Sequence, residues 1–158
     1  MVKCLTITSY TIIISCDVFL YHVHTFEVRM HFESQIKILQ DNEYKFNIIC
    51  DSDQWLGIIC FWEFNQFIYI EHFAINAQLR NKQYGQRTLQ LLRKEYADKK
   101  LILEIDPLVD DIAKRRKAFY ERCGFVANTF KHIHLPYRPG FAGHELIVMS
   151  SPSFIISA

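Results

Sequence analysis

Residues 74–87 of this 158-residue chain read AINAQLRNKQYGQR, an apolar strand end followed by a polar loop and the start of a helix. Such a junction presents unpaired backbone N–H groups and the positive end of a helix dipole, which suit the binding of a phosphate. Gly85 would let the backbone approach an anion closely. Arg80, Lys82 and Arg87 add positive charge around it. The segment therefore predicts an anion-binding loop, although basic turns of this kind are also common as solvated loops.

A second stretch, RRKAFYERCGF at residues 115–125, reads as a helix that ends at Gly124. Together the two stretches resemble the GNAT superfamily of N-acetyltransferases. Family members carry Arg/Gln-x-x-Gly-x-Gly/Ala at the pyrophosphate loop, and RNKQYG at residues 80–85 occupies those positions. They also carry Phe-Tyr-Glu-x-x-Gly-Phe at a helix end, which residues 119–125 match. The resemblance covers residues 55–149, and the first 50 residues agree only in the order of their elements.

Two positions depart from the family pattern. Gln83 stands where the loop usually has its first glycine, and Ala113 stands seven residues before Tyr120, where many members place an asparagine that touches CoA. Both departures are expected to weaken cofactor binding without abolishing it, because Gly85 and the helix dipole remain.

Hydrophobic periodicity predicts the elements around these motifs. Strands are expected at 5–14, 43–49, 55–64, 66–76, 101–105, 126–132 and 144–149, and helices within 19–38, at 88–96 and at 110–122. The three consecutive strands from 43 to 76 indicate an antiparallel meander, and the alternation after residue 76 indicates helices packed on a mixed sheet. With the resemblance, the expected fold is a single α/β domain over residues 1–158, with a largely antiparallel sheet, a splayed central strand and flanking helices.

The resemblance also implies how the site works, by direct transfer of acetyl from acetyl-CoA to an amine. The backbone of the central strand would hold the pantetheine arm, and the loop would hold the pyrophosphate. The residues implied in cofactor binding are Phe73, Ala74, Ile75, Arg80, Gln83, Tyr84, Gly85, Gln86, Arg87 and Tyr120. Tyr120 would also donate a proton, or a hydrogen bond, to the departing thiolate.

The acceptor side needs groups that handle a cation. An alkyl amine with a pKa near 10 is only about one part in a thousand neutral at pH 7, so a base assists its attack. Glu71 lies near where some family members keep a carboxylate base, and a water chain leading to a base is the alternative. Glu104 on the next strand, and Tyr137 in the loop 136–140, are expected to contact the acceptor.

Histidines give no expectation of a metal. His132 and His134 are close in sequence, but no third ligand stands at a useful spacing, so acetyl-CoA is the only cofactor expected. His72 alternates to the opposite face from Glu71 and is predicted to pack beneath a helix. None of the five cysteines forms a C-x-x-C pair, which fits reduced thiols.

Composition limits the partners. Eighteen Lys and Arg balance 17 Asp and Glu, giving a net charge of +1, which argues against a nucleic-acid-binding module. The apolar run before Asp17 contains several Thr and Ser residues and is too short to span a membrane, so a strand is preferred to a lipoprotein signal at Cys16. A cytoplasmic monomer or homodimer that acetylates a small-molecule amine is expected. The alternatives are acetylation of a protein or peptide amine, and a CoA-binding module without catalysis.

Overall fold

The structure is a computed structural model that describes residues 2–6, 37–52, 54–135 and 142–151. Its strands are β1 (Val2–Thr6), β2 (Tyr44–Asp51), β3 (Gln54–Glu63), β4 (Phe67–Ile75), β5 (Lys100–Ile105), β6 (Val126–Ala127), β7 (His132–His134) and β8 (His144–Ser151). Its helices are the short 3-10 helix η1 (Ala77–Leu79), α3 (Tyr84–Glu95) and α4 (Asp111–Arg122). Among these described residues, no helix is both long and apolar enough to cross a membrane.

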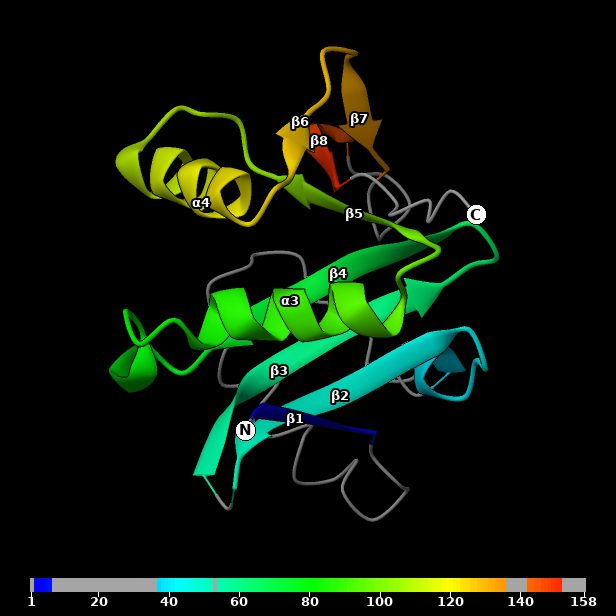
Figure 1. The fold of residues 1–158 in the computed structure, drawn as a ribbon. Coiled ribbons are helices and arrows are strands. Elements are labelled where there is room, and N and C mark those ends of the chain that lie inside the picture. The colour runs from blue at the N-terminus through cyan, green and yellow to red at the C-terminus, as the bar shows by residue number, and fades with distance from the viewer. Residues whose placement is uncertain (1, 7–36, 53, 136–141, 152–158) are drawn as a thin grey trace, which may run out of the picture.

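The strands form a mixed sheet in the order β1-β2-β3-β4-β5-β8-β6, and β7 pairs with β8 beside this path. Only the β4–β5 pair is parallel, and every other described pairing is antiparallel. In Figure 1, α3 lies across β3 and β4, and α4 lies beyond it next to β5. The expected α/β class, the β2–β3–β4 meander and the largely antiparallel sheet are confirmed.

The largest differences from the sequence prediction concern three elements. Helix α3 starts at Tyr84, a full turn before residue 88, because its first turn is polar and lacks the apolar stripe used to place it. The strand expected at 126–132 is two short strands, β6 and β7, both of which pair with β8. Strand β1 begins at Val2, and the rest of the strand expected at 5–14 lies outside the described residues, as do most of the helices expected within 19–38.

Helix α4 is fixed at both ends by local chemistry. The Asp110 side chain accepts a hydrogen bond from the Ala113 N–H at 2.7 Å, which caps the first turn. At the other end, Phe125 N–H donates to the Tyr120 carbonyl and Gly124 N–H donates to the Glu121 carbonyl. This pair of bonds is a Schellman motif, and Gly124 takes the left-handed φ of 85° that it requires. The motif explains why the helix ends where the sequence predicted.

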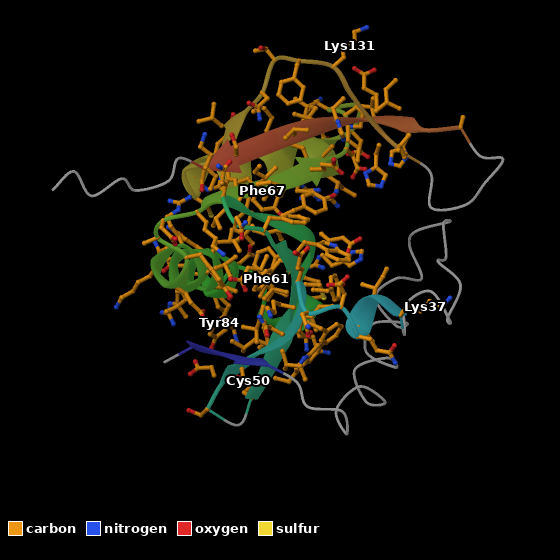
Figure 2. All side chains as sticks on the ribbon, turned by 90° about the vertical axis from the view of Figure 1, so that its right-hand side faces the viewer. Lys37, Cys50, Phe61, Phe67, Tyr84 and Lys131 are labelled. Carbon is orange, nitrogen blue, oxygen red and sulfur yellow. The ribbon has the colours of Figure 1, made fainter. Side chains whose placement is uncertain are left out.

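The core lies between the sheet and the two helices. On β5, Leu101, Leu103 and Ile105 are buried, and they join Leu89 and Leu92 of α3 in one apolar cluster. Phe61 of β3, which is labelled in Figure 2, is almost completely buried in the same cluster. Since side chains alternate along a strand, Ile102 and Glu104 belong to the opposite face of β5.

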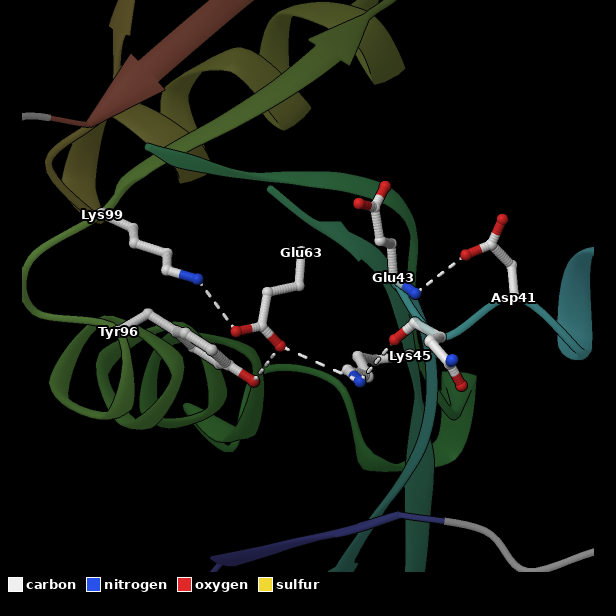
Figure 3. A network of polar contacts seen from close by, with 7 residues as sticks. Asp41, Glu43, Lys45, Glu63, Tyr96 and Lys99 are labelled. Atoms are coloured by element: carbon white, nitrogen blue, oxygen red, sulfur yellow. Dashed lines mark hydrogen bonds and ion pairs between the residues drawn. The ribbon is translucent and has the colours of Figure 1, made fainter. Parts of the chain in front are cut away.

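A polar network ties the far end of the core together (Figure 3). The carboxylate of Glu63, at the end of β3, accepts a hydrogen bond from Lys99 Nζ at 2.9 Å and one from the Tyr96 hydroxyl at 3.4 Å. The hydrogen bond from Lys99 is the main cause that lowers the pKa of Glu63. This network anchors the C-terminal end of α3 and the turn into β5. The candidate site lies at the opposite, N-terminal end of the helix.

Candidate active site

Strands β4 and β5 pair over a short length and then separate. Their parallel register runs from Phe67 opposite Lys100 to Ile70 opposite Leu103 and stops there. The later residues Phe73, Ala74 and Ile75 pair with β3 on one side but not with β5 on the other. This is the splayed central strand that the sequence resemblance implied, and it leaves strand-edge backbone groups where an extended ligand would add as a strand.

A β-bulge lies at the separation point. Consecutive β3 residues Phe61 and Cys60 pair with Ile70 and His72, so that Glu71 is the extra residue on β4. The bulge interrupts the side-chain alternation. The prediction that His72 lies opposite Glu71 is therefore wrong, since His72 Nε2 is 3.9 Å from the Glu71 carboxylate.

Glu71 is a nearly buried carboxylate, with a side chain that is 9% exposed. Burial, with Cys60 and Glu71 close by, raises the pKa of the Tyr44 hydroxyl, so Tyr44 stays neutral next to the carboxylate. Burial also lowers the pKa of His72, against the opposing effect of Glu71. Tyr44 and His72, both neutral at pH 7, thus lie beside the Glu71 carboxylate.

The basic loop ends on an uncapped helix. No side chain caps the N-terminus of α3, whose first turn contains Tyr84, Gly85 and Gln86. Arg87 lies in the same turn, with its guanidinium 5.8 Å from the centre of the Tyr84 ring. Arg80 is exposed and directs its Nε toward the Ile75 carbonyl at 3.4 Å. The unpaired amides, the helix dipole and the cations therefore fit the diphosphate of a CoA molecule.

Gln83 occupies a position that favours glycine. As the N-cap of α3 it has a φ of 62°, in the left-handed region. The left-handed backbone gives a physical reason for the glycine that the family usually has at this position, and Gln83 adopts the same conformation at a steric cost.

Replacing Gln83 by glycine is expected to raise the free energy of unfolding by up to about 1 kcal/mol, since the left-handed conformation costs an L-residue roughly 1–2 kcal/mol and glycine's extra chain entropy offsets part of the gain. Gln86→Gly, in the first turn of the same helix, should lower it instead. Urea unfolding of both variants measures the difference. Equal effects of the two substitutions would contradict the strained conformation at Gln83.

Three predicted segments meet at Gly85. A Cβ atom placed on Gly85 would lie 3.1 Å from Phe119 Cζ and 3.7 Å from Ile75 Cγ1. The start of α3, the end of α4 and the end of β4 are thus in direct contact. The structure therefore brings the loop motif and the Phe-Tyr-Glu-x-x-Gly-Phe motif together, as a shared ligand would require.

Tyr120, the next residue along α4, is 8% exposed and packs edge-on against Phe119 and Phe125. Burial is the main cause that raises its pKa to about 12, with Arg116 acting in the opposite direction. The hydroxyl is therefore protonated at neutral pH and able to donate.

Glu104 has more partners than the sequence indicated. Its Oε2 accepts a hydrogen bond from the Tyr69 hydroxyl at 2.9 Å and lies 2.8 Å from His134 Nδ1. Its Oε1 lies 2.5 Å from His132 Nε2. Glu71 and Glu104 therefore lie in two separate surroundings, and Glu104 is grouped with His132 and His134.

Sequence reasoning missed Tyr44 and Tyr69 as neighbours of the two carboxylates. The spacing of Tyr69 and Glu71 places both on one face of a regular strand, but the contact partners come from β2 and β5, which no local pattern reveals. Tyr137 and the loop around it lie outside the described residues.

The fold and the candidate site are of the acyltransferase type. Comparison with known proteins identifies the family. Residues 10–125 match the acetyltransferase (GNAT) family. The chain belongs to this family, whose members use acetyl-CoA. Among curated protein sequences, none matches the chain.

Solved structures share the fold. A Bacteroides thetaiotaomicron protein assigned to the GNAT family has 30% identity and a TM-score of 0.83, with 94% of this chain and 86% of that one covered. The ribosomal-protein-S18-alanine N-acetyltransferase of Escherichia coli has 14% identity and a TM-score of 0.70, with 99% and 97% covered. A spermidine N-acetyltransferase chimera from Vibrio cholerae has 14% identity and a TM-score of 0.63, with 95% and 94% covered.

Proposed function

We propose that this protein is an acetyl-CoA-dependent N-acetyltransferase that acts on a primary amine of a small molecule. The observation that carries the proposal is the end of the β4–β5 pairing at Ile70 and Leu103, beyond which β4 continues to Ile75 at the uncapped N-terminus of α3. The edge of β4 at Phe73, Ala74 and Ile75 would bind the pantetheine amides. The first turn of α3 would bind the pyrophosphate, as helix N-termini do.

Tyr120 would act as the proton donor. Acetyl-CoA supplies an activated acyl group, and transfer forms a carbon–nitrogen bond while the carbon–sulfur bond breaks. The thiolate that leaves needs a proton, and the Tyr120 hydroxyl, with a pKa raised to about 12, holds one throughout the neutral range.

Glu71 would bind the ammonium group of the substrate and accept its proton. The substrate arrives as a cation and must lose a proton before its nitrogen can attack. A nearly buried carboxylate with neutral Tyr44 and His72 beside it can attract the ammonium group and then accept its proton, directly or through water. Glu104 and Tyr137 are proposed to contact the rest of the acceptor.

The small-molecule proposal rests on the near-neutral charge of the chain, a balance that favours a small compound over a basic protein tail. Acetylation of a protein or peptide amine is the second candidate. It gains support from the fold shared with the E. coli enzyme, which acts on an alanine of a ribosomal protein. We place the protein in the cytoplasm, as a monomer or homodimer without a nucleic-acid or membrane partner.

The deciding experiment is thermal unfolding with and without acetyl-CoA. Ligand at 100 times its dissociation constant should add about 2.7 kcal/mol, which for a chain of this size raises the melting temperature by roughly 5–10 °C. CoA should reproduce the shift and ATP should not. A screen of small amines and N-terminal peptides, with release of free thiol as the readout, then separates the two substrate classes.

Two charge reversals on one helix provide the control. Arg87→Glu, in the first turn of α3, should reduce the shift, whereas Lys94→Glu, in the last turn, should leave it unchanged. No shift at millimolar acetyl-CoA would overturn the enzyme proposal. A shift without turnover of any amine would favour the CoA-binding module without catalysis.

A further inference from the structure

Two histidines of β7 converge on a carboxylate of β5. His132 and His134 are two residues apart on one strand, so their side chains share a face, and Glu104 reaches them from another strand. One ligand atom from each of the three residues lies within 4.8 Å of the other two. Since Glu104 is distant in sequence from the two histidines, the grouping is a product of the fold.

We propose that Glu104, His132 and His134 form a binding site for a divalent transition-metal ion such as Zn²⁺. Two imidazole nitrogens and one carboxylate oxygen are a donor set that zinc and its neighbours in the first transition row prefer. The set carries one negative charge when both imidazoles are neutral, which partly balances a divalent ion. The proposal concerns metal binding alone and does not depend on acetyl transfer.

His132 provides the second observation. Its Nε2 is buried and makes no hydrogen bond with any described residue, although Glu104 Oε1 is only 2.5 Å away. An N–H at Nε2 is therefore not aligned with the carboxylate. A buried nitrogen without a hydrogen-bond partner is costly, and an ion shared between this nitrogen and the carboxylate would remove that cost.

The surroundings of Glu104 match those of a metal-binding carboxylate. The Tyr69 hydroxyl donates to Oε2 at 2.9 Å and so fixes the orientation of the carboxylate, the role that outer partners play at metal sites. Three protein ligands leave at least one coordination position open, as in catalytic rather than structural zinc sites. Glu104 follows Leu103, the last β5 residue paired with β4, so the ion would lie beside the point where the strands separate.

Cobalt titration of the untagged protein, without acetyl-CoA or amine, tests the site. One equivalent of Co²⁺ should produce the visible absorption of a four- or five-coordinate complex, and Zn²⁺ should displace it. His132→Asn and Glu104→Gln should each weaken binding at least tenfold, since even outer partners of metal ligands cost 10–100-fold when removed.

His144 supplies the matched control. It is exposed, and its ring centre is 5.5 Å from that of His134, but it is not among the three converging ligands. His144→Asn should therefore keep the affinity. Absence of the cobalt spectrum in the wild-type protein, or equal binding by the His132→Asn variant, would overturn the proposal. Melting curves of the metal-free variants verify that each is folded. If His132→Asn or Glu104→Gln does not fold, His134→Asn is titrated in its place.

Discussion

Phenylalanine at position 120 is expected to lower kcat at least tenfold while the affinity for acetyl-CoA changes little. The substitution keeps the ring that packs against Phe119 and Phe125 and removes only the hydroxyl. A general acid contributes typically 10²–10⁴-fold to a rate, so the tenfold limit is conservative. Steady-state kinetics with an amine from the screen, and calorimetry with acetyl-CoA, measure the two quantities.

The loss should also be independent of pH across the neutral range, because a group with a pKa of about 12 keeps its proton there. Tyr96→Phe is the matched control, as it removes the hydroxyl that contacts Glu63 at the other end of α3. An unchanged kcat in Tyr120→Phe would remove the hydroxyl from the mechanism.

Gly57→Ala should produce the largest loss of stability. A Cβ atom at this position of β3 would lie 2.0 Å from the Ala74 carbonyl oxygen, a backbone atom that cannot move without separating β3 from β4. Inserting atoms into well-packed sites typically costs 1–3 kcal/mol, and a clash with backbone should cost at least about 3 kcal/mol. That corresponds to a fall in melting temperature of roughly 6–12 °C.

The same substitution should impair acetyl-CoA binding in whatever protein remains folded, since Ala74 belongs to the proposed pantetheine edge. Ile59→Val, on the same strand, is the control and should cost only about 0.5–1.5 kcal/mol. A Gly57→Ala variant as stable as this control would show that β3 and β4 do not approach as described.

From residue 43 onward, most of the fold could be predicted from local sequence patterns. The capping Asp110, the helix-ending Gly124 and the alternating strands all act on near neighbours in sequence, so their effects can be recognised without a structure. The sequence prediction starts α3 too late because the first turn of the helix lacks an apolar stripe.

The candidate site follows from the sequence where it coincides with family motifs, and it does not where strands from different parts of the chain meet. Gly85 and Tyr120 lie in such motifs. The bulge at Glu71 depends on the register of β3 against β4, which a single strand does not encode. The grouping of His132 with Glu104 depends on β8, which lies between β5 and β7 in the pairing pattern and sets how far His132 reaches.

The contact between Gly85 and Phe119 has an evolutionary consequence. A side chain at position 85 would press on the Phe119 ring, so a descendant that gains one must shrink or shift the aromatic residue to keep the helices in place. Substitutions at these two positions should therefore be inherited together, and a library randomised at both should yield active pairs that neither single change allows.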